Sequence, residues 1–145
     1  MILSPGFPAD EADTTCLPSQ QLFIKEINKN FPSLKIMVIA FQYPFSKSEY
    51  EWNKNKVFAF AGNGRGKLQR FFLWIRICRK LRQLKKENNI IGLLSFWCGE
   101  TALLGTWFGR KYHLKHRCWI SGQDAKKENK YIKWIRPKSE ELVAM

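Results

Sequence analysis

The second half of the chain holds residues that could bind a polar ligand, in two strand–turn stretches. The apolar run 90–96 has the length of a buried strand, and Trp97-Cys98-Gly99-Glu100 follows it where a helix begins. A second apolar run, 117–120, is followed by Ser121-Gly122-Gln123-Asp124. Loops that follow parallel strands meet at one edge of the sheet, where ligands bind in open α/β folds. Carboxylates and amides there can hydrogen-bond sugar hydroxyls, and an indole can cover an apolar sugar face.

The full candidate site draws on four loops that each follow a predicted strand. We expect the loops after Ser4, Phe41, Phe96 and Ile120 to converge on one groove. Its candidate ligand-binding residues are Gly6, Phe7, Asp13, Gln42, Trp97, Glu100, Gln123 and Asp124. The two carboxylates of the second half also have structural explanations, because Glu100 can stabilise a helix start and Asp124 can form a turn. The sequence leaves both explanations open.

The run Gly62-Asn63-Gly64-Arg65-Gly66-Lys67 lies between a predicted strand and a predicted helix, as a phosphate loop would. A Walker loop would need Gly at Ala61 and Ser or Thr at Leu68, and the dinucleotide fingerprint would need its third Gly at Lys67. Neither pattern is met. We therefore interpret the run as an exposed basic turn, although an anion could still meet Arg65, Lys67 and the helix amides.

Cysteine chemistry is a weaker candidate. Cys98 follows a strand, as the nucleophile of a hydrolase elbow does, but the Gly-x-nucleophile-x-Gly spacing is missing. The only two histidines, His113 and His116, fall toward the opposite edge of the sheet. Since the four cysteines are widely spaced and form no CxxC pair, they are typical of reduced thiols in a cytosolic protein. We interpret Cys98 as a buried small residue.

The formal net charge of +13 indicates an anionic partner. Basic residues concentrate in the predicted helix 67–87 and its entry turn, where Glu87 is the one acid. This face is either solvated or docks on an anionic membrane, each basic residue contributing about 1 kcal/mol near the surface. Nucleic acid is disfavoured as a partner because no recognised binding motif accompanies the charge. The predicted contacts to an anionic surface are Arg65, Lys67, Arg76, Arg79, Arg82 and Lys86.

Hydrophobic patterning predicts the elements that position these residues. Uniformly apolar runs, typical of strands covered on both faces, are separated mostly by helical segments. The pattern predicts an α/β fold: one Rossmann-like domain over residues 1–145, with a parallel sheet and helices on both faces. The predicted strands are 2–4, 35–41, 57–61, 90–96 and 117–120, with another beginning at 141; the predicted helices include 16–30 and 67–87, and 42–55 is a predicted loop.

The predicted helix 67–87 carries an apolar stripe at helical spacing. Phe71, Trp74, Ile77 or Cys78, Leu81 and Leu84 are expected to form its buried face. No signal peptide is visible in the acidic segment 1–13, and the most apolar window, 90–108, is a poor membrane span. These features favour a cytosolic protein that is peripheral at the inner face of the membrane.

Four stretches resemble the amino-terminal half of bacterial family 4 glycosyltransferases of the two-Rossmann-domain (GT-B) type. They are residues 2–21, which open ILSPGFP and continue EADTT, 62–74 (GNGRGKLQRFFLW), 90–99 and 118–126 (CWISGQDAK). The resemblance implies that this half binds the acceptor, a glycan or lipid-linked precursor. It also implies a retaining transfer without metal or other cofactor, from a nucleotide-sugar bound by a carboxyl-terminal domain that is absent here.

Two positions depart from the pattern of this family. Many relatives carry a glycine pair where Gly6 stands alone, and a His where this chain has Ser121-Gly122-Gln123, so the resemblance assigns no catalytic side chain. The parent enzyme would be a hexosyltransferase, and this chain alone would be inactive. Two alternatives stay open: a stand-alone, non-catalytic Rossmann-like binding module, favoured if Met145 is the natural end, and a basic nucleic-acid-binding protein.

Overall fold

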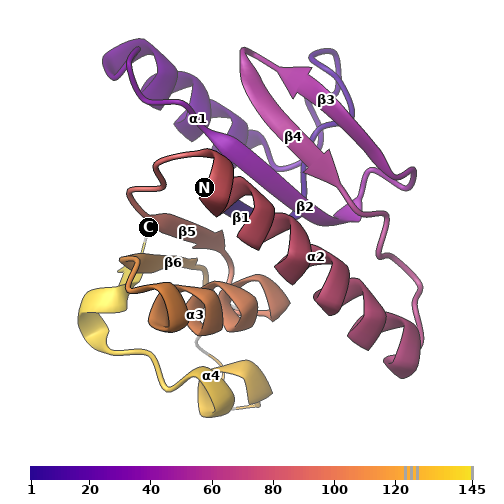
Figure 1. Cartoon of the computed structure of the whole chain (residues 1–145), viewed down its shortest axis with the longest axis vertical. Helices are drawn as coiled ribbons and strands as arrows, with labels where there is room; N and C mark the ends of the chain where they lie inside the picture. The colour runs from indigo at the N-terminus through magenta and orange to yellow at the C-terminus, as the bar shows by residue number, and fades with distance from the viewer. Residues whose placement is uncertain (123, 125, 127, 145) are drawn as a thin grey trace.

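Strands and helices alternate along most of the chain (Figure 1). The computed structural model describes residues 1–122, 124, 126 and 128–144. The helices are α1 (Pro18–Asn30), α2 (Lys67–Glu87), α3 (Glu100–Tyr112), α4 (Lys130–Ile135) and the 3-10 helix η1 (Ser139–Glu141). The strands are β1 (Ile2–Gly6), β2 (Met37–Tyr43), β3 (Ser48–Trp52), β4 (Asn55–Ala59), β5 (Leu93–Phe96), β6 (His116–Ile120) and β7 (Leu142–Ala144).

The strands form one seven-stranded sheet in the order β3-β4-β2-β1-β5-β6-β7. Every neighbouring pair is parallel except β3 with β4, which is antiparallel. Without β3, the chain order across the sheet is that of a Rossmann fold, with β1 near the middle and the direction of progression reversing beside it. The predicted parallel α/β sheet is therefore confirmed, and β7 forms where a further strand was expected to begin.

The prediction of a loop over residues 42–55 is wrong. The end of β2, the edge strand β3 and the start of β4 all fall in this segment, and β4 begins two residues before the predicted strand at 57. Asn53 and Lys54 both adopt positive φ, of 45° and 65°, and so make the two-residue turn of a β-hairpin. The strand was missed because an edge strand keeps exposed polar side chains, here Glu49 and Glu51, and lacks the continuous apolar run of a central strand.

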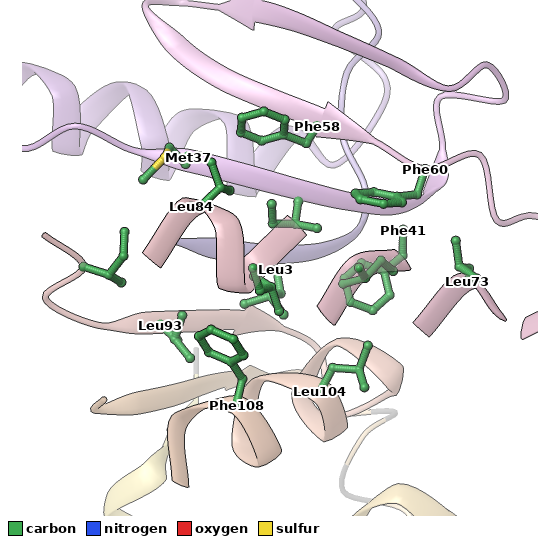
Figure 2. Packing of buried hydrophobic residues seen from close by; sticks show 14 residues of the cluster. Leu3, Met37, Phe41, Phe58, Phe60, Leu73, Leu84, Leu93, Leu104 and Phe108 are labelled. Carbon is green, nitrogen blue, oxygen red and sulfur yellow. The ribbon is translucent and has the colours of Figure 1, made fainter. Parts of the chain in front are cut away.

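One face of the sheet is covered by α2 and α3. Side chains that alternate along the central strands, such as Met37, Ile39 and Phe41 of β2, point to this face and pack against the two helices. Figure 2 shows this layer, with Leu73 and Leu84 of α2, and Leu104 and Phe108 of α3, directed at the sheet residues.

The opposite face is covered by α1. The intervening residues of the strands, such as Val38 and Ala40, join a second core with Ile24 of α1. The ring of Phe23 packs edge-to-face on Trp119, with centroids 5.1 Å apart. Helices therefore lie on both faces of the sheet, as predicted (Figure 1).

The predicted buried stripe of α2 is partly wrong. Ile77, Leu81 and Leu84 are buried as expected, but the stripe continues through Leu73, and Phe71 is 57% exposed. This packing requires a glycine at position 62, because a Cβ there would stand 2.4 Å from Cδ2 of Leu73 and 2.6 Å from the carbonyl oxygen of Phe41. Only a glycine lets Leu73 come so close to the sheet. Among the described residues, no helix is both long and apolar enough to cross a membrane.

Candidate functional site

The sheet has one topological switch point, between β1 and β5. The chain leaves β1 toward α1 on one face, and leaves β5 toward α3 on the other. Connections that depart to opposite faces open a crevice at the carboxyl ends of the two strands, where ligands bind in doubly wound sheets. The residues at the switch point are those that follow Gly6 in β1 and Phe96 in β5.

Trp97 turns the chain sharply at the carboxyl end of β5. Its backbone adopts φ 65°, a left-handed conformation that costs a non-glycine residue about 1–3 kcal/mol. Its N–H donates to the carbonyl of Trp119 (2.8 Å), and its own carbonyl accepts from Oγ1 of Thr101 (3.1 Å). These bonds hold the turn, and the indole is 37% exposed. The side chain of Trp97 is thus partly accessible to solvent at the switch point.

Glu100 opens α3 and is only 8% exposed. Its Oε1 lies 3.0 Å from Nε of Arg70, in the first turn of α2, and the hydroxyl of Tyr131 in α4 donates to the same oxygen at 3.5 Å. Burial raises the pKa of Tyr131, and the Glu100 charge acts in the same direction, so the phenol stays protonated. The carboxylate is therefore kept between a guanidinium that is 42% exposed and a phenolic donor.

Neither Arg70 nor Tyr131 was among the residues predicted for this site. Arg70 is one of many basic residues in its helix, and Tyr131 follows a polar linker. A salt bridge between residues so far apart in sequence leaves no local pattern. The only sequence signal is the type of each residue: a cation at one helix start and an acid at the next.

The loop after β6 lies against this cluster. Oδ2 of Asp124 accepts hydrogen bonds from the backbone N–H (2.8 Å) and the hydroxyl (3.1 Å) of Ser121. Asp124 therefore stabilises a turn, which is the structural role that the sequence also allows for it. The side-chain amide of Asn129 donates to the carbonyls of Cys98 (3.0 Å) and Asp124 (3.1 Å). Asn129 therefore ties the loops after β5 and β6 together. Gln123 lies outside the described residues.

The loops after β1 and β2 form a second cluster, organised by Asp13. Its carboxylate accepts hydrogen bonds from the backbone of Ala9, Thr15 and Cys16, from the Thr15 hydroxyl, and from the hydroxyl of Tyr43 at 3.0 Å. Desolvation opposes ionisation of Asp13, but the hydrogen bonds outweigh it and lower its pKa. Asp13 is thus an ionised loop organiser that joins the two loops.

The remaining residues of this second cluster differ in accessibility. Phe7 is fully buried, with its ring edge-to-face on Trp52 at 5.0 Å between centroids, so it supports the loop from below. Gly6 is also buried, whereas Gln42 is half-buried near the end of β2. No hydrogen bond or ion pair between described side chains joins this cluster to that of Glu100. The structure thus brings the predicted residues together as two clusters on the carboxyl side of the sheet, and a single groove stays a prediction.

The glycine-rich turn before α2 is mostly exposed, in agreement with its interpretation as a basic turn. Asn63, Gly64 and Lys67 are exposed, and Nε of Arg65 donates to the carbonyl of Ala61 at 3.1 Å. Arg76, one of the predicted surface contacts, bends toward the sheet, with its guanidinium 5.8 Å from the ring centroid of Phe60.

The other predicted surface contacts on α2 are Arg79, Arg82 and Lys86, and all three are exposed. They extend from the part of the helix that faces away from the sheet. The side chain of Arg76 therefore points toward the sheet, whereas those of Arg79, Arg82 and Lys86 point away from it.

Cys98 is buried, 2% exposed, and lies beside the Cys118 thiol. The hydrogen bond between the two thiols, together with burial, raises the pKa of Cys118. His116 is bonded to Ser95 and Thr106, so it is engaged away from Cys98. The pair is therefore a packed element of the core, as the sequence indicates for Cys98.

Comparison of the chain with protein-family models, with curated protein sequences and with solved structures found no match.

Proposed function

We propose that the chain is the acceptor-binding half of a retaining glycosyltransferase, which transfers a sugar from a nucleotide-sugar to a glycan or lipid-linked acceptor. The observation that carries the proposal is the juxtaposition of Trp97 with the Glu100–Arg70 pair at the switch point of a Rossmann-like sheet. The resemblance of four stretches of the sequence to family 4 enzymes supports it independently.

The chemistry of this cluster suits a hydroxyl-rich ligand. Glu100 can accept hydrogen bonds from sugar hydroxyls while Arg70 compensates its charge. The exposed indole of Trp97 can cover the apolar face of a pyranose ring. Such groups bind and orient an acceptor; the donor and its diphosphate are assigned to a second domain.

Acceptor binding can be measured directly on the 145-residue chain by saturation-transfer NMR and calorimetry. The ligands are a panel of oligosaccharides, sugars linked to short, water-soluble prenyl diphosphates, and free nucleotide-sugars. We expect an acceptor to bind, and Trp97→Ala or Glu100→Gln to weaken it about tenfold, since each removes roughly one stacking or charged hydrogen-bonding contact.

Matched controls separate the site from general effects. Trp107→Ala removes an indole of similar exposure, 43%, from α3, and Glu51→Gln removes an exposed acid from the edge strand. Both should leave acceptor binding unchanged. Binding of nucleotide-sugars alone, or acceptor binding that is indifferent to Trp97 and Glu100, would contradict the proposal.

A further inference from the structure

The outward face of α2 is apolar at its amino-terminal end. Leu68, Phe71 and Phe72 are 78%, 57% and 63% exposed, and the rings of the two phenylalanines lie edge-to-face at 6.1 Å. They are not part of the helix face that packs on the sheet, whose buried residues begin at Leu73. Three adjacent large apolar side chains in water are unfavourable unless a partner covers them.

The same face is basic at its carboxyl-terminal end. Arg79, Arg82 and Lys86 are exposed, and with Lys85 and Tyr112 they line a depression of about 380 Å³ beside α3. The single acid of α2, Glu87, accepts a hydrogen bond from Gln83 (2.8 Å) and lies off this face.

Trp107 of α3 extends the basic end of this face. Its indole is 43% exposed and lies 6.0 Å from the guanidinium of Arg82 and 5.1 Å from the ammonium of Lys111. An exposed indole among cations is a common arrangement at the boundary between water and a lipid headgroup region.

Helix geometry puts the two ends on one side of the molecule. Leu68 and Lys86 are about five turns apart at 3.6 residues per turn, so their side chains leave α2 in the same direction, about 27 Å apart along the axis. Phe72, Arg79 and Arg82 leave within about 40° of that direction, and Phe71 within about 60°. One flat surface could therefore contact all of them.

We propose that α2 lies along an anionic lipid bilayer, with Leu68, Phe71 and Phe72 inserted at the headgroup–acyl boundary and Arg79, Arg82 and Lys86 on lipid phosphates. Complementary charge selects this partner, because the face carries no acid and the chain has a net charge of +13. An aliphatic side chain beside two phenylalanines suits acyl chains. The proposal extends the electrostatic contact predicted from sequence by an apolar anchor, and it holds whether or not the chain binds a sugar acceptor.

Sedimentation with sucrose-loaded vesicles tests the proposal. Vesicles of phosphatidylcholine with about 30% phosphatidylglycerol should capture the chain, and pure phosphatidylcholine should capture it far less. Arg79→Gln, Arg82→Gln and Lys86→Gln together should weaken binding roughly 100-fold at low salt, at about 1 kcal/mol per charge. Leu68→Ser, Phe71→Ser and Phe72→Ser together should weaken it at least about tenfold, and should do so at high salt too, because apolar burial is not screened.

Two control triples match these changes elsewhere on the molecule. Lys29, Lys35 and Lys47, all exposed and outside α2, are changed to Gln to remove the same charge. Leu22, Phe31 and Ile91, which are 61%, 60% and 72% exposed, are changed to Ser to remove a similar apolar area. Both controls should retain most of the vesicle binding.

Insertion has its own readout. Brominated acyl chains should quench the tryptophan fluorescence of the Phe72→Trp variant more than that of the unsubstituted chain. Equal capture by neutral vesicles, no effect of the apolar triple, or no added quenching would overturn the proposal. Two other results would also overturn it. One is a dimer, detected by light scattering, that the apolar triple variant no longer forms. The other is binding to a single-stranded oligonucleotide, through the same residues, that is tighter than binding to the vesicles.

Discussion

A buried histidine should make the stability of this fold fall steeply in mild acid. His116 is 7% exposed, and its Nε2 lies 2.8 Å from Oγ of Ser95, while its Nδ1 lies 3.1 Å from Oγ1 of Thr106. The Ser95 hydroxyl donates to the carbonyl of Thr101 (3.0 Å), so Nε2–H must donate to Ser95 and Nδ1 accepts from Thr106. The network is complete with a neutral imidazole.

Burial therefore lowers the pKa of His116 from its ordinary value of 6.5 to about 4, with the charges of Arg110 and Arg117 acting in the same direction and Glu141 opposing them. Between these two values the unfolded chain binds a proton that the native chain does not. The free energy of unfolding therefore decreases as the pH falls from 6.5 toward 4. Above pH 6.5, the contribution of His116 to this free energy does not change with pH. Lowering the pKa of His116 from 6.5 to about 4 corresponds to about 3 kcal/mol of folding stability lost by pH 4.

Urea unfolding at several pH values from 7 to 4 measures this effect, compared between the native chain and His116→Gln. The carboxylates titrate in both proteins, so the difference between the two curves isolates His116. We expect the native chain to lose about 3 kcal/mol more than the variant over this range. His113→Asn, at the exposed histidine that follows α3, should keep the steep decline because it keeps His116. Parallel curves for the native chain and His116→Gln would refute the reasoning.

Three further predictions concern packing, the ion pair and activity. Gly62→Ala should lower the free energy of unfolding by about 1–3 kcal/mol in urea titrations, because the added methyl overlaps Leu73 and the backbone of Phe41; an unchanged midpoint would show that α2 can shift freely. Arg70→Gln should destabilise the chain by about 1–2 kcal/mol, since it leaves the buried Glu100 carboxylate without its cation. Adding Glu100→Gln should restore part of this loss. Additive effects of the two substitutions in thermal melts would argue against coupling between the two side chains. The 145-residue chain should transfer no sugar from any nucleotide-sugar in a radiolabel assay, because the proposed function leaves the groups that stabilise the developing diphosphate charge to a second domain. Turnover by this chain would refute that part of the proposal.

The parallel sheet could be predicted because its central strands are apolar at successive positions. The first five residues of β2, from Met37 to Phe41, are all buried, which requires helices on both faces and hence parallel connections. The antiparallel edge hairpin could not be found in the same way. Its strand β3 alternates exposed acids with Tyr50 and Trp52, and in a short segment such a pattern also fits a loop.

The candidate site was predictable only in part. Trp97 and Glu100 stand in a strand–turn–helix stretch, so topology alone puts them at the switch point. Arg70 and Tyr131 lie about thirty residues away in opposite directions, and only the packing of α2 and α4 beside α3 brings them to Glu100. The spacing of residues in the sequence does not predict which helix ends lie next to each other in the fold.

The outward face of α2 shows most clearly what the sequence determines and what only the tertiary structure determines. The sequence by itself determines that this segment is helical, strongly basic, and apolar in its first half. It cannot determine which apolar side faces inward, because Leu68, Phe71, Phe72, Leu73 and Trp74 surround the helix axis and more than one stripe satisfies the helical period. The tertiary structure decides: Gly62 admits Leu73 to the core, and this rotation leaves Leu68, Phe71 and Phe72 in contact with solvent. The choice is one of steric fit between the helix and the sheet, which no local pattern contains.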